Sequence, residues 1–360
     1  MNDAMRNCSE PELSGVKPPP SGAAPGREVH LDEWVSPHIC DDRGRLRAGK
    51  ILEWMDVVGV LAAVRHARRT VATVSVDGMQ LLEPVNVGDR VRMTASVGYT
   101  SRRSIGVSVR MLHGLSTDEK MRRCVDGYMT FVAMDDTGEL ADVPQFVPET
   151  PVEVARFREG QLRREFRRKL EAGMVSTMEP FADVPPSEQP LLVRELLKRL
   201  PFRMPWDRDL RPQARHSSYM HTIEPVREQH LNFHGTLYGG TLMRWMETTA
   251  SLSARAYAGS AMRLAGLHGL NFIRPVHRNV FVHIRSVVVH SSDVDLTVLV
   301  NVHSENPVDG SYDETLRAFV TYVPAGDQAP RIPPLECRSE EDRALFEEVE
   351  HRRALQRSTT

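Results

Sequence analysis

Cysteine is scarce in this sequence, and its cysteines are not paired. The four cysteines of the 360-residue chain lie far apart and form no CxxC pair. This spacing argues against a zinc cluster and against a disulfide framework, so we expect a reducing compartment, the cytoplasm. No apolar run has the length of a signal peptide or of a transmembrane helix, and an integral membrane protein is therefore not expected.

The sequence also lacks an excess of charge of either sign. The formal net charge is -2 at pH 7, with 46 basic and 48 acidic residues interspersed along the chain. Without a basic block to bind a phosphate backbone, nucleic acid is not an expected partner. The sequence also has no GxxxxGK loop and no GxGxxG fingerprint, so nucleoside triphosphate or dinucleotide chemistry is not indicated.

The most informative feature that is present is an internal repeat. GRLRAGKILEWMD, beginning at Gly44, matches GTLYGGTLMRWME, beginning at Gly235, and 235 minus 44 is a shift of 191 residues. The same shift places Asp56 on Glu247 and Phe131 on Tyr322 without a gap. One shift over so long a span indicates a duplication.

Both copies have the same predicted order of elements. A helix is expected at about 47–66 in the first copy and at about 238–257 in the second, from apolar residues at helical spacing. Alternating apolar residues predict four strands after each helix, at 71–82, 91–100, 105–112, 127–134 and at 264–273, 280–289, 294–303, 316–323. The fold class is therefore α+β, an antiparallel sheet that covers a buried helix.

Composition sets the expected domain boundaries. Residues 1–28 are expected to form a flexible tail, 29–135 the first domain, and 136–215 a charged helical and proline-rich linker. Residues 216–325 form the second expected domain, and 326–360 a charged C-terminal helix or tail. In the linker the repeat is broken, and we expect its helix to serve packing or assembly.

A helix wrapped by an antiparallel sheet, with a glycine-containing turn before the helix and an acid two turns inside it, resembles the hotdog pattern. Two such units in one chain resemble the tandem-hotdog acyl-CoA thioesterases, and the resemblance covers residues 29–324. It implies an intrachain pseudo-dimer, a hydrolase for acyl-CoA thioesters of fatty acid metabolism, no cofactor and no metal. It also implies a homo-oligomer, a trimer of such chains; the lipid-binding START domain that some relatives append is not expected.

The resemblance implies an active site between the two units. A carboxylate of one helix, Asp56, works there with the turn before the other helix, which contains His234, Thr236, Gly239 and Gly240. The family usually has asparagine where this chain has Thr236, and a hydroxyl cannot replace both ends of an amide.

The residues themselves favour the same chemistry. Asp56 is the one acid among apolar neighbours, where burial raises the pKa of a carboxyl toward that of a useful general base. The alternative is a hydrogen-bonded structural acid. Gly240 would offer a helix-terminal amide to the oxyanion, or it and Gly239 would simply permit close packing. Thr236 would orient water or cap the helix, and His234 would bind substrate or be a polar turn residue.

The second copy should differ. The position that matches Thr236 is Arg45, which we expect to hold Glu247 in an ion pair and to lower its pKa. One competent site per chain is then predicted, at Asp56, and the site of Glu247 is structural or vestigial.

Three arginines at strand ends, Arg102, Arg103 and Arg274, are candidates for the diphosphate of coenzyme A, or are ordinary solvated charges. Two other functions stay open. One is a non-catalytic acyl-CoA binding or regulatory module, and the other is a hotdog hydratase or dehydratase, for which His38 and His66 are not well placed.

Overall fold

The computed structural model describes residues 28–115, 121–135, 137–173, 213–214, 218–232, 234–326 and 331–357. Residues 1–27 of the expected N-terminal tail and residues 174–212 of the expected linker lie outside these residues. Within the described part of the chain, no helix is long and apolar enough to cross a membrane.

The first unit has one long helix and a meander of strands, as the periodicity predicted. The helix α1 spans Ala48–Ala67, and the strands after it are β2 (Thr70–Leu81), β3 (Asp89–Thr100), β4 (Ser104–Leu115) and β5 (Arg122–Met134). A strand that the sequence analysis missed, β1 (Glu28–Trp34), precedes the helix and pairs with β3, and a short β6 (Leu140–Ala141) pairs with β5.

The second unit repeats this order. It consists of β8 (Met220–Pro225), α4 (Gly239–Ala258), β9 (Met262–Phe272), β10 (Phe281–Ser291), β11 (Leu296–Glu305) and β12 (Tyr312–Pro324). The strand β8, also missed, corresponds to β1 and pairs with β10. The strand β1 is largely exposed and β8 is largely half-buried, so neither has the run of buried alternate residues that marks a strand.

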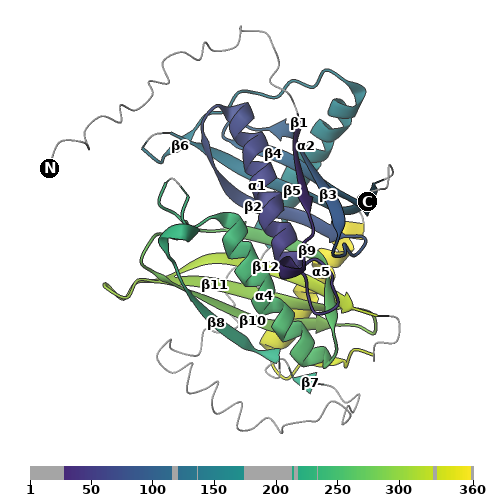
Figure 1. Cartoon of the computed structure of the whole chain (residues 1–360). Coiled ribbons are helices and arrows are strands. Elements are labelled where there is room, and N and C mark those ends of the chain that lie inside the picture. The colour runs from purple at the N-terminus through teal and green to yellow at the C-terminus, as the bar shows by residue number, and fades with distance from the viewer. Residues whose placement is uncertain are drawn as a thin grey trace, which may run out of the picture.

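One antiparallel sheet runs through both units, in the order β1-β3-β4-β5-β2-β9-β12-β11-β10-β8 (Figure 1). The two halves join where β2 pairs with β9, with Ser75 opposite Asn271 and Gln80 opposite Gly266. The predicted α+β fold, a double hotdog with an intrachain pseudo-dimer, is confirmed.

The helices α1 and α4 contact each other on the same face of this sheet, and we call their contact the seam (Figure 1). At the middle of the seam, Glu53 of α1 forms an ion pair with Arg244 of α4, with an N–O distance of 3.3 Å. Because 53 plus 191 is 244, these two residues occupy the same position in the two copies.

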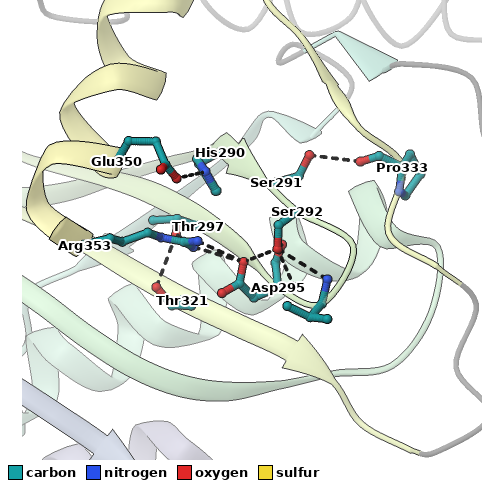
Figure 2. Close-up of polar contacts among 10 residues, drawn as sticks. His290, Ser291, Ser292, Asp295, Thr297, Thr321, Pro333, Glu350 and Arg353 are labelled. Atoms are coloured by element: carbon teal, nitrogen blue, oxygen red, sulfur yellow. Dashed lines mark hydrogen bonds and ion pairs between the residues drawn. The ribbon is translucent and has the colours of Figure 1, made fainter. Parts of the chain in front are cut away.

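Two further helices cover the opposite face of the sheet. In β10, Val288 packs in the core with α4, whereas its neighbours Val287 and Val289 pack with Leu345 and Val349 of α5 (Glu340–Arg357). Alternate side chains of a strand point to opposite faces, so α5 lies on the face away from α4. Polar contacts anchor it there: Arg353 donates to Asp295 at 3.1 Å and to Thr297 at 2.9 Å, and His290 pairs with Glu350 at 2.6 Å (Figure 2).

The helix α2 (Pro151–Gly173) is placed in the same way on the first unit. Its Arg156 donates to Ser96 of β3 at 3.1 Å, and its Phe157 contacts Tyr99 of β3. Since β3 and β10 are equivalent strands, α2 and α5 are equivalent helices, although no sequence repeat was visible there. The pattern of the repeat is lost on these exposed helices because few of their positions are constrained by burial.

Candidate active site

Asp56 lies in the seam, on the face of α1 that contacts α4. Its side chain is only 3% exposed. Two donors hold its carboxylate: the Thr73 hydroxyl donates to Oδ1 at 2.8 Å, and the backbone N–H of Gly240 donates to Oδ2 at 2.7 Å. The carboxylate of one copy is therefore bound by the helix start of the other copy.

The glycine pair at the start of α4 makes this approach possible. A Cβ atom on Gly240 would lie 3.1 Å from the Glu53 backbone, and a Cβ on Gly239 would lie 3.3 Å from Asp56 Oδ2. Any larger residue would push the helices apart, so the two glycines serve close packing. The Gly240 amide, predicted as a donor to the oxyanion or as a position for close packing, donates to Asp56 in this structure.

Thr73 is a site residue that sequence reasoning did not find. It lies on β2, 17 residues after Asp56, and strand residues of this kind are usually assigned to packing. Only the fold brings its hydroxyl to the carboxylate.

The turn before α4 is held together by Asn232, a second residue that was missed. Its Oδ1 accepts from the backbone N–H groups of His234 at 2.9 Å and Thr236 at 3.2 Å, and its Nδ2 lies 2.9 Å from the Thr236 hydroxyl. The N-cap of α4 is Tyr238, so Thr236 does not cap the helix. An amide side chain is thus present in this turn. It lies four residues before Thr236, the position at which the family usually has asparagine. The shift of 191 pairs Asn232 with Asp41, and this signal could have found it.

Burial raises the pKa of the Asp56 carboxyl above its ordinary value, and the hydrogen bonds from Thr73 and Gly240 counter part of that rise. Glu53 nearby adds a smaller rise by charge repulsion. A carboxyl with a raised pKa is a better proton acceptor than an exposed one once it is ionised.

Glu247 lies in the seam at the position equivalent to that of Asp56. It is 8% exposed, and its Oε2 accepts from the backbone N–H of Gly49, in the first turn of α1, at 3.1 Å. Its Oε1 lies 3.3 Å from the Tyr322 hydroxyl. Because 49 plus 191 is 240, each copy's carboxylate binds the same amide of the other copy's helix.

The predicted ion pair between Arg45 and Glu247 is wrong. Arg45 pairs instead with Asp41, at 3.1 Å, and donates to the Ala325 carbonyl at 3.1 Å. Asp41 lies in the same turn and is partly exposed, so this pair forms without burying the guanidinium in the seam. Burial instead raises the pKa of Glu247, to about 7, against the lowering effects of the Tyr322 and Gly49 hydrogen bonds.

The two ends of the seam differ in the groups around the carboxylate. The hydroxyl at Asp56 comes from Thr73, whose opposite neighbour in the sheet is Phe131. In the second copy the equivalent pair is Leu264 and Tyr322, so the hydroxyl has moved to the adjacent strand. A side chain longer by one methylene, glutamate in place of aspartate, accompanies this change.

The three arginines proposed for coenzyme A are ion-paired on the surface. Arg102 and Arg103 both pair with Asp142, at 3.1 Å and 3.4 Å, and their side chains are 76% and 49% exposed. Arg274 pairs with Asp313. Among the described residues, no group of three His, Cys, Asp or Glu side chains is arranged to hold a metal ion.

Parts of the chain are similar in sequence to known thioesterases. Residues 44–115 and 234–311 match the model of the thioesterase superfamily. The acetyl-coenzyme A thioesterase of Mus musculus is 25% identical over 327 residues, which cover 88% of this chain and 55% of that protein. An acyl-CoA thioester hydrolase of Bacillus subtilis (strain 168), YkhA, itself uncharacterized, is 31% identical over 121 residues, which cover 33% of this chain and 70% of that protein.

A solved structure shows the same fold. The protein assigned as an oleoyl thioesterase of Lactobacillus plantarum superposes with a TM-score of 0.50 at 9% identity, over 83% of this chain and 97% of that chain. The protein is thus a double-hotdog protein by its fold. By its sequence it belongs to the thioesterase superfamily. It spans about half the length of relatives such as the mouse acetyl-coenzyme A thioesterase.

Proposed function

We propose that this protein hydrolyses acyl-CoA thioesters to a free acid and coenzyme A, in the seam between its two units, with Asp56 as general base or nucleophile. Membership of the thioesterase superfamily supports the reaction class. One observation supports the residue: a buried carboxylate lies between the Thr73 hydroxyl and the start of α4. Burying a carboxylate has a cost, and carboxylates with raised pKa values are found preferentially at functional sites.

The chemistry requires a nucleophile and a stabilised oxyanion. As a base, Asp56 accepts a proton from water while the water oxygen attacks the thioester carbonyl carbon. The carbonyl oxygen then becomes an oxyanion, and the C–S bond breaks as it collapses, with the proton passing to the departing thiolate. As a nucleophile, Asp56 would itself form a C–O bond to the acyl carbon while the C–S bond breaks and coenzyme A leaves as the thiolate, which takes up a proton. Water would then hydrolyse the anhydride and give back the Asp56 carboxylate and the free acid. In either route the positive end of the α4 dipole favours the developing charge.

A single site per chain, at Asp56, is part of the proposal. Beside Asp56, Gly239 has no Cβ atom, and a Cβ there would lie within 3.4 Å of both carboxylate oxygens and of Phe272. At the other end of the seam the equivalent residue is Ala48, which has that atom. Thr73 likewise has Leu264 as its counterpart. The Asp56 end therefore differs from the Glu247 end in the strand that supplies the hydroxyl, β2 instead of β12, and in the absence of a Cβ atom beside the carboxylate.

Coenzyme A is proposed to enter as part of the substrate, with no separate cofactor. Arg102, Arg103 and Arg274 are exposed enough to exchange their carboxylate partners for a diphosphate, because surface ion pairs are weak. The cytoplasmic location and the trimer of chains remain proposals. They rest on cysteine usage and on the family resemblance.

Thiol release from short-, medium- and long-chain acyl-CoAs tests the proposal. Asp56→Asn keeps the size of the side chain but removes its basicity, so we expect kcat to fall by about 10²–10⁴-fold. Thr248→Ala, on the exposed face of α4, is the matched control and should leave kcat unchanged. Turnover by Asp56→Asn at the wild-type rate would refute the role of Asp56. Acyl-CoA binding without thiol release from any substrate would favour the non-catalytic module.

A further inference from the structure

The hydrogen bonds of the seam form a reciprocal arrangement that couples its two ends. Gly49 and Asp56 are seven residues apart on α1, close to two helical turns, so they lie on the same face of the helix. Gly240 and Glu247 have the same spacing on α4. Each helix thus presents an amide at its start and a carboxylate two turns later, and the antiparallel partner presents the reverse.

Glu247 secures the start of α1, the helix that carries Asp56. The N–H of Gly49 is one of the amides that have no partner within their own helix, and it donates to Glu247 Oε2 at 3.1 Å. The approach is tight: a Cβ on Gly49 would lie 3.2 Å from that oxygen and 3.2 Å from the Arg244 carbonyl. The two bonds lie about 10 Å apart along the helix, on either side of the Glu53–Arg244 ion pair, so together they define the direction of α1 against α4 more closely than that central contact alone.

Tyr322 in turn fixes Glu247. It is 1% exposed, and its hydroxyl lies 3.3 Å from both the Glu247 Oε1 atom and the Glu247 backbone carbonyl. The strand β12, which carries Tyr322, is paired on both sides within the sheet. The sheet, Tyr322, Glu247 and the start of α1 are therefore connected through buried groups.

We propose that Glu247 is a positioning residue for the site of Asp56, rather than the base of a second site or a vestige. This inference rests on the proposed function. By anchoring Gly49, Glu247 holds α1 at the angle at which Asp56 meets the Gly240 amide and the Thr73 hydroxyl. A small displacement of a catalytic group can lower a rate by about 100-fold, so the anchor has a large effect on turnover.

Two variants of Glu247 test this by kinetics. Glu247→Ala removes the acceptor for the Gly49 amide, and we expect kcat to fall at least about tenfold while KM stays within about twofold. Glu247→Gln keeps an acceptor oxygen and should keep kcat within about threefold of wild type. Thr248→Ala is again the control. An equal fall in both Glu247 variants would overturn the proposal, as would unchanged turnover in Glu247→Ala.

Retention of about half the wild-type turnover by Asp56→Asn, lost in a double variant with Glu247→Gln, would also overturn it. Glu247 would then be a catalytic centre of its own.

Hydrogen–deuterium exchange gives an answer that is independent of turnover. In Glu247→Ala we expect faster exchange in the peptide that contains Gly49 and also in the peptide that contains Gly240, because the helices pivot together. Faster exchange at Gly49 alone would show a local role and refute positioning. Should the wild-type protein release no thiol, the proposed hydrolase activity fails while this measurement still decides the role of Glu247.

Discussion

Burial of Glu247 in the seam should make the free energy of unfolding depend on pH. The substitution Glu247→Gln tests this dependence. The pKa of Glu247 is raised from 4.5 to about 7 by burial. The folded chain therefore holds a proton on Glu247 at pH values at which the unfolded chain has lost it. Folding is favoured at low pH, and the free energy of unfolding should decline as the pH rises from about 4.5 to about 7.

The size of this effect follows from the two pKa values. The interval from 4.5 to about 7 corresponds to about 3 kcal/mol, at about 1.4 kcal/mol for each pKa unit. Glutamine has nearly the same shape and does not ionise, so Glu247→Gln removes this contribution. The variant should match the wild type at about pH 4.5 and exceed its stability by as much as about 3 kcal/mol above pH 7.

Urea unfolding of both proteins at several pH values between 4 and 8 measures this difference. Arg45→Ala is a useful control, because Arg45 pairs with Asp41 and not with Glu247. It changes the titration of Asp41 at the acid end of the range and should leave the decline toward pH 7 unchanged. A constant difference between wild type and Glu247→Gln across this range would refute the reasoning. It would mean that Glu247 titrates near its ordinary pKa in the folded chain.

Two further substitutions probe the Asp56 end of the seam. Thr73→Val removes the hydroxyl that donates to Asp56, so the pKa of Asp56 should rise further. The acid limb of the kcat/KM–pH profile should then move to higher pH, and an unmoved limb would contradict this. Gly239→Ala places a methyl group 3.3 Å from Asp56 Oδ2 and from Phe272, so kcat/KM for thiol release should fall about tenfold or more with the fold kept. Ala48→Gly, at the equivalent position of α1, is its matched control and should leave kcat/KM unchanged. An equal loss of kcat/KM in both variants would show that turnover depends on the structure of the two helix starts and not on the contact beside Asp56.

Most of the fold could be predicted from the sequence, because buried helices and strands have a strict apolar period. The predicted helices at 47–66 and 238–257 agree with α1 and α4 to within one residue at each end. The pairing of β2 with β9 could not be predicted, since nothing in the period of a strand identifies its neighbour. For the same reason the sequence indicated two hotdogs but not that they share one sheet.

The candidate site was predictable only in part. Asp56 was singled out because an acid among apolar residues is unusual, and Gly240 because the first amides of a helix are free to donate. The acceptor of the Gly240 amide was predicted as an oxyanion, whereas in the structure it is Asp56. Thr73 has no such signal. The error at Arg45 came from reasoning by pseudo-symmetry, which correctly opposed its turn to Glu247 but ignored Asp41, four residues away. An arginine loses less hydration free energy in an ion pair with a local, partly exposed carboxylate than in an ion pair with a buried carboxylate.

The ion pair of Glu53 with Arg244 has a consequence for how the two copies recognise each other. In a dimer of identical hotdogs, a residue at this position would face its own copy and could meet only a like charge or a neutral group. Duplication within one chain removes that restriction, and here the same position carries opposite charges. Separate halves should therefore prefer each other to themselves, since self-pairing would oppose two glutamates or two arginines. Co-expressed halves with distinct tags would show this preference as mixed pairs, and a random mixture would argue against it.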